Sequence, residues 1–142
     1  QGITQMVRTA GNEEGIDRTL EYGARDFEGL CFTNLVDYDM LYGHRRDVDG
    51  YAKALTCFDE KLPLILEKMR DDDVLMITAD HGCDPAYTKT TDHTREHTPF
   101  LMYGKNIKPV NYKTRDTFAD IAATVLDYLG VSGSVDGTSL LA

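Results

Sequence analysis

The four histidines of this 142-residue sequence gather beside aspartates in two short segments. His44 belongs to the first segment, and His81, His93 and His97 belong to the second. Imidazole nitrogens together with carboxylate oxygens suit borderline divalent ions such as Zn²⁺ and Mn²⁺. The clustering therefore predicts a metal site, and because no cysteine is placed to join it, the site is not typical of structural zinc.

The spacing of the acidic partners indicates how such a site could form. Asp80 and His81 are adjacent and follow an apolar run, so they can converge at a strand-to-loop turn. Asp39 and His44 are five residues apart, which we interpret as a loop spacing that includes a tight glycine turn. Each pair alone is a weak signal, since an Asp-His dipeptide is usually loop chemistry. The set of three segments that ends with His93 is a much stronger one.

Residues next to the predicted ligands allow two interpretations each. Asp37 lies two residues before Asp39, so in extended chain it could be a second ligand, or it could cap a loop and support the ligands from outside. Arg45 or Arg46 could bind a phosphate, because a guanidinium group suits phosphate oxygens, or could form a salt bridge with a following aspartate.

Four further residues flank the second segment. Asp92 could orient a histidine, while a surface or turn role is at least as good for Asp84. His97 favours a structural or supporting role over direct ligation. Cys83 is a poor nucleophile candidate, because no separate base and orienting group accompany it.

The hydrophobic pattern alternates between helical and strand-like periods, which is typical of an α/β layered fold. Two predicted strands end in Asp and His residues and a third follows the histidine-rich loop, and strand ends are where ligands bind in open α/β sheets. The pattern predicts helices over residues 13–26, 49–70 and 116–129, and strands over 30–36, 74–79 and 99–103. Asn12 is predicted as the N-cap of the first helix and Gly130 as the stop of the last.

Composition excludes several classes of protein. The formal net charge of −9 argues against a nucleic-acid partner, and no apolar run is long enough to cross a membrane. The three widely spaced cysteines favour reduced thiols and a cytoplasmic location. Because Gln1 is not an initiator and the first residues do not resemble a signal peptide, the chain reads as part of a longer protein.

Three sequence words carry a resemblance to a known family. They are Gly-His-Arg-Arg-Asp at 43–47, Asp-His-Gly at 80–82 and Thr-Asp-His-Thr-Arg-Glu at 91–96. Asp-His-Gly followed by His-Thr is similar to the two-metal signature of the alkaline phosphatase superfamily, and the other two words resemble the phosphopentomutase family within it. The resemblance implies a three-layer α/β sandwich. Residues 1–142 would form the C-terminal part of the metal-binding core domain, without its N-terminal segment and without the cap domain.

The resemblance also implies roles for individual residues. Asp39, His44 and His93 resemble the ligands of one manganese ion, and Asp80 and His81 resemble two ligands of a second. The catalytic threonine that carries the phosphate matches no residue here and is expected upstream, so the isolated chain should be inactive.

The implied activity interconverts 1- and 5-phosphates of ribose or deoxyribose through a phosphothreonine enzyme. The expected partners are a sugar phosphate and an activating sugar bisphosphate. The rival hypotheses are a cofactor-independent phosphoglycerate mutase or phosphohydrolase with the same metal cage, and a metal-binding module that is not an enzyme.

Overall fold

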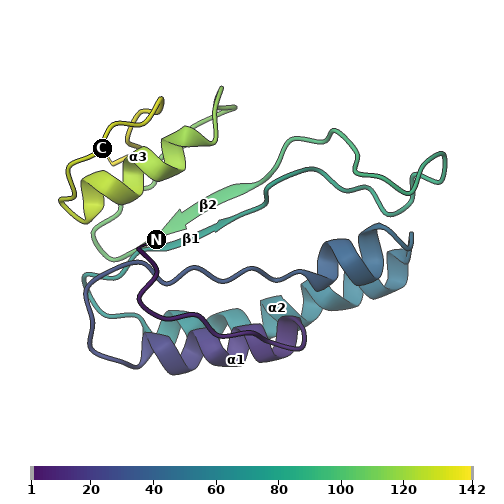
Figure 1. The fold of residues 1–142 in the computed structure, drawn as a ribbon, viewed down its shortest axis with the longest axis horizontal. Coiled ribbons are helices and arrows are strands. Elements are labelled where there is room, and N and C mark those ends of the chain that lie inside the picture. Colours follow the sequence, from purple (N-terminus) through teal and green to yellow (C-terminus); the bar gives the residue numbers. More distant parts are fainter. Residues whose placement is uncertain (1, 142) are drawn as a thin grey trace.

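The computed structural model describes residues 2–141 and places helices on both sides of a strand pair. Helices α1 and α2 lie on one side of the two strands, and α3 with the C-terminal tail lies on the other (Figure 1). None of the helices in residues 2–141 has the length and apolar character of a membrane span. In chain order the elements are α1 (Asn12–Gly23), the π-helix η1 (Tyr38–Gly43), α2 (Val48–Lys68), β1 (Leu75–Thr78), β2 (Phe100–Tyr103) and α3 (Ala119–Tyr128).

Strands β1 and β2 pair antiparallel, with Leu75 opposite Tyr103 and Thr78 opposite Phe100. Because successive side chains of a strand point to opposite faces, Phe100 and Met102 are half-buried whereas Leu101 and Tyr103 are exposed. The loop of residues 79–99 joins the two strands and extends beyond them toward the start of α2 (Figure 1). This loop carries three of the four histidines.

The predicted strand over residues 30–36 is wrong for the described chain. The segment is extended and runs in the same direction as β1 in Figure 1, but it belongs to no strand ladder within residues 2–141. Thr33 and Leu35 face Gly15 of α1, whereas Phe32 is 80% exposed. The alternation of a strand is therefore present, and the missing feature is a neighbouring strand to accept its hydrogen bonds.

Helix α1 begins differently from the prediction that Asn12 caps it. Gly11 is the N-cap residue and its position has no side-chain cap. Asn12 is instead the first helical residue, and its backbone N–H donates to the carboxylate of Asp37 at 2.7 Å. In return the Asn12 amide oxygen accepts the backbone N–H of Asp37 at 3.0 Å. Of the two readings of Asp37, the structure supports the cap.

Helix α3 binds the C-terminal tail through two buried side chains. The hydroxyl of Thr124 donates to the Asp120 carbonyl at 2.6 Å and accepts the backbone N–H of Leu140 at 2.9 Å. The Asp120 carboxylate accepts the N–H of Thr138 at 2.8 Å and the guanidinium of Arg115 at 2.7 Å. These two contacts, the backbone one first, lower the pKa of Asp120. The end of the tail is therefore attached to α3 although it forms no regular element.

The helix stop at Gly130 is confirmed, since Gly130 has a left-handed backbone with φ of 62° just after α3. The mixed α/β character is also confirmed, with helices flanking a sheet. The three-layer sandwich stays a prediction, because the sheet formed by residues 2–141 has two strands.

Candidate metal centre

Asp39 and His44 are brought together by a π-helix rather than by the loop that we expected. In η1 the backbone N–H of His44 donates to the carbonyl of Asp39 at 2.9 Å, which is the five-residue spacing of a π-helical hydrogen bond. The two side chains consequently lie on the same side of the π-helix, with His44 Nε2 3.3 Å from Asp39 Oδ2. The five-residue spacing is that of a π-helical turn, whereas the sequence predicted a loop.

The loop of residues 79–99 folds back on itself to bring His81 and His93 together. A β-bridge joins Gly82 to Thr94, and the Thr94 hydroxyl accepts the backbone N–H of Asp84 at 2.6 Å. A side chain at position 82 would lie 2.6 Å from the backbone of the neighbouring loop segment, which explains the glycine in Asp-His-Gly. The rings of His81 and His93 stack with centroids 3.5 Å apart.

The carboxylate of Asp39 lies at the centre of the resulting cluster. Its Oδ2 faces His44, and its Oδ1 lies 3.3 Å from Nε2 of His93 and 3.8 Å from Nε2 of His81. This Oδ1 is buried and has no hydrogen-bond donor among the described residues. Asp39, His81 and His93 each offer one ligand atom within 4.8 Å of the others. A buried carboxylate oxygen without a hydrogen bond is stabilised by a cation or a hydrogen-bond donor beside it.

Backbone carbonyls fix which nitrogen of two histidines faces Asp39. Nδ1 of His44 lies 2.5 Å from the Thr91 carbonyl, and Nδ1 of His81 lies 3.0 Å from the Gly82 carbonyl. A carbonyl only accepts hydrogen bonds, so each Nδ1 is the donor and each Nε2 is the nitrogen left to face the cluster as a possible ligand. Nitrogen lone pairs and a carboxylate that converge in this way fit a divalent cation.

The other predicted ligand, Asp80, lies at the rim of the cluster. Its side chain is 91% exposed, and its Oδ1 is 3.7 Å from Nε2 of His81. The geometry thus brings Asp39, His44, His81 and His93 together more closely than it brings Asp80. The assignment of these residues to two separate ions stays a prediction.

The residues flanking the ligands now have distinct environments. Asp92 accepts the backbone N–H of His93 at 2.8 Å, a contact that lowers the pKa of Asp92 and supports the orienting role. Asp84 accepts the N–H of Ala86 at 2.8 Å, as expected of a turn. His97 is exposed and joins none of the contacts of the cluster within residues 2–141. Burial raises the pKa of the Cys83 thiol, which disfavours a thiolate nucleophile.

The guanidinium of Arg46 contacts backbone carbonyls of the loop of residues 79–99 rather than a following aspartate. Its guanidinium donates to the backbone carbonyls of Thr90 at 2.8 Å and Asp84 at 3.0 Å, and also to that of Asp92. No salt bridge within the described chain involves Arg45 or Arg46. The sequence does not predict these contacts, because every residue has the same backbone carbonyl and the side-chain types give no sign of which carbonyls an arginine will bind.

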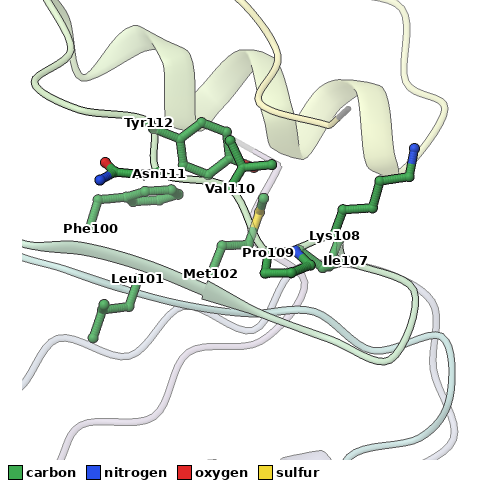
Figure 2. A pocket seen from close by; sticks show the side chains of 9 residues that line it. All are labelled: Phe100, Leu101, Met102, Ile107, Lys108, Pro109, Val110, Asn111 and Tyr112. Carbon is green, nitrogen blue, oxygen red and sulfur yellow. The ribbon is translucent and has the colours of Figure 1, made fainter.

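A separate hollow of about 380 Å³ lies between β2 and residues 107–112. Phe100 and Met102 point into it beneath Tyr112, while Leu101 points away (Figure 2). Its lining contains one charged side chain, Lys108, and none of the predicted ligands. The hollow is therefore not part of the metal centre.

Comparison with known proteins identifies the class. The family model described as Metalloenzyme superfamily matches residues 1–133, and the chain belongs to this superfamily.

Within that class the similar curated proteins are phosphopentomutases. The chain is 59% identical over 141 residues to the phosphopentomutase of Lachnoclostridium phytofermentans and 58% identical over 142 residues to that of Acetivibrio thermocellus. It is 55% identical over 140 residues to that of Clostridium acetobutylicum.

These matches cover 98–99% of the chain and 36% of each relative, so the chain spans about a third of the length of the curated relatives it matches. The resemblance to phosphopentomutases is confirmed. A metal cofactor is supported both by the superfamily and by the Asp-His cluster.

Proposed function

We propose that this chain is the metal-binding part of a phosphopentomutase that interconverts the 1- and 5-phosphates of ribose or deoxyribose. The observation that carries the proposal is the convergence of His44, His81 and His93 on the carboxylate of Asp39. The similarity to phosphopentomutases over almost the whole chain supports this reaction over others of the superfamily.

The donor set favours a particular kind of ion. The clustered groups are carboxylate oxygens and imidazole nitrogens without thiolate, and such donors suit Mn²⁺ or Zn²⁺. We propose manganese, with two ions in the whole enzyme. Asp39, His44 and His93 would hold the first ion, and Asp80 and His81 would contribute to the second.

The chemistry requires neutralisation of a moving phosphoryl group and alignment of the attacking and leaving oxygens, which bound divalent ions would supply. The residues of this chain would hold the ions and orient the side chains that bind them. The carbonyls of Thr91 and Gly82 keep Nδ1 of His44 and His81 protonated, so each Nε2 points to Asp39. The phosphate-carrying threonine, the remaining metal ligand and the cap that excludes water would come from the part of the enzyme that precedes this chain.

The test uses the complete gene product with Mn²⁺ and ribose 1-phosphate. We expect ribose 5-phosphate to form, with stimulation by a catalytic amount of a ribose bisphosphate. Release of inorganic phosphate instead would identify a phosphohydrolase, and turnover of phosphoglycerate would identify the other mutase of the superfamily. Absence of all three activities in a protein that binds manganese would favour a metal-binding module.

We also propose that the partners are small sugar phosphates and that the protein is cytoplasmic, with neither nucleic acid nor membrane as a partner. The net charge of −9 and the free cysteines support this view.

A further inference from the structure

Arg46 occupies a backbone position that normally belongs to glycine. It follows η1 with φ of 54°, in the left-handed region that disfavours residues with a Cβ atom. The backbone N–H of Arg46 donates to the Gly43 carbonyl at 3.1 Å, and that of Asp47 donates to the Tyr42 carbonyl at 2.9 Å. This pair of bonds is the Schellman motif, whose left-handed residue is usually glycine. An arginine at this position therefore carries a backbone cost that glycine would avoid.

The guanidinium of Arg46 binds one side of the loop of residues 79–99, called the histidine loop below. Nε donates to the Thr90 carbonyl at 2.8 Å and Nη1 to the Asp84 carbonyl at 3.0 Å, while Nη2 donates to the carbonyl of Asp92. These acceptors lie 38 to 46 residues further along the chain. One planar group thus spans the stretch from Asp84 to Asp92, which leads directly into His93.

A second contact lies within the same stretch. Thr91, between two of the carbonyls that Arg46 binds, presents its own carbonyl to Nδ1 of His44 at 2.5 Å. The end of η1 and the histidine loop are consequently joined at four carbonyls, three of which belong to successive residues. Both ends of this junction carry side chains that face Asp39, because His44 and His93 lie on its two sides.

We propose that Arg46 is a positioning residue of the metal centre: its guanidinium fixes residues 84–92 so that Nε2 of His93 meets Asp39 and the Thr91 carbonyl meets His44. The proposal rests on the metal site of the proposed function. It assigns no contact between Arg46 and the substrate.

Electrostatics and positioning predict opposite effects of removing Arg46. Loss of a positive charge beside a cation site should strengthen metal binding. Loss of the positioning contacts should weaken it, because groups that orient metal ligands typically contribute 10- to 100-fold in metal affinity. The sign of the change therefore separates the two explanations.

The main variant is Arg46→Gly, in the complete protein. Glycine suits the left-handed backbone, so the turn itself should form at least as readily as before. Arg46→Lys keeps the charge but cannot reach three carbonyls. Arg45→Gln is the matched control, since Arg45 is exposed, lies next to the same site and makes none of the side-chain hydrogen bonds found in residues 2–141.

Manganese binding would be measured by electron paramagnetic resonance titration, and amide hydrogen exchange of residues 84–92 would be followed in metal-free protein. We expect about 10- to 100-fold weaker manganese binding and faster exchange for Arg46→Gly and Arg46→Lys. For Arg45→Gln, which also removes a positive charge, we expect wild-type exchange and manganese binding that is unchanged or tighter. Unchanged or tighter binding with unchanged exchange in Arg46→Gly would overturn the proposal.

The two proposals fail in different ways. If the wild-type protein bound manganese but did not convert ribose 1-phosphate, the proposed function would fail while the binding comparison still tested Arg46. If the wild-type protein bound no manganese, exchange in the metal-free variants would still decide whether Arg46 holds the loop.

Discussion

Asp39 connects two parts of the chain that are 42 or more residues apart in sequence, because its two carboxylate oxygens face different histidines. Oδ2 is near His44, the residue that ends the same π-helix, whereas Oδ1 is near His81 and His93 in the long loop. A carboxylate oxygen buried between imidazoles is stabilised by positive charge nearby, which a metal ion or protons can supply. Asp39 is therefore the residue whose loss should affect the site most.

The variant Asp39→Asn tests this view. It preserves the shape of the side chain and removes the charge, so manganese affinity should fall at least about 100-fold, which is the upper range for residues that only support ligands. Isothermal titration of the complete protein with Mn²⁺ would measure the change. Asp59→Asn, at an exposed position of α2, is the control and should bind as the wild type does.

At the scale of elements, the sequence predicted the helices and two strands well and the local structure around the site poorly. The apolar periodicity places α2 and α3 within a few residues of their observed bounds, because burial of one helical face determines that period. The π-helix has no periodicity of its own, since it is a single turn. The clustering of histidines beside Asp39 and Asp80 predicted the candidate site, but the contacts of Arg46 depend on tertiary structure alone.

Helix α3 offers a test of how strongly the C-terminal tail is attached. Thr124 has no exposed surface, and its hydroxyl satisfies the N–H of Leu140. Thr124→Val keeps the volume but leaves that N–H buried without an acceptor, so the free energy of unfolding should fall by about 1–3 kcal/mol. Thr56→Val is the control, because the Thr56 hydroxyl makes the same contact to the preceding turn at an exposed site. Equal effects of the two substitutions in denaturant unfolding would contradict the prediction.

Attachment of the tail should also depend on pH. The N–H of Thr138 and the Arg115 guanidinium hold the pKa of Asp120 below its ordinary 3.8. A depressed pKa in the folded state means that the stabilisation is present above the ordinary value and is lost as pH falls through the folded value. The protection of the Thr138 amide against hydrogen exchange, corrected for intrinsic rates, should therefore decline below about pH 3.8.

Asp120→Asn should abolish most of this pH dependence and lower the protection of Thr138 at neutral pH. Asp116→Asn, exposed and close in sequence, should leave both unchanged. An identical pH profile in Asp120→Asn and wild type would show that another group controls the tail.

At the scale of the whole molecule, the described chain exposes apolar strand faces. Phe32 and Leu30 are 80% and 62% exposed, and Leu101 on β2 is 61% exposed. Large apolar side chains aligned along extended segments are typical of a surface that other structure covers. The curated relatives are almost three times as long as the chain, and their remaining length is one source of such cover.

In the complete protein we expect residues 30–36 to pair as a strand. Their backbone amides should then be protected from hydrogen exchange by at least about 100-fold relative to an unstructured peptide, whereas the exposed segment 131–135 of the tail should exchange faster. Mass spectrometry of deuterated peptides would measure both. Rapid exchange of residues 30–36 in the complete protein would mean that the extended segment stays unpaired there.

The reciprocal hydrogen bonds between Asn12 and Asp37 have an evolutionary consequence. Asp37 stands two residues before Asp39, so the start of α1 is attached to the beginning of the segment that bears the central carboxylate. A change at either position leaves the other with an unmatched donor or acceptor. Natural sequences of this family should therefore conserve the two positions jointly or replace them as a covarying pair, and lineages that altered only one should show compensating changes nearby.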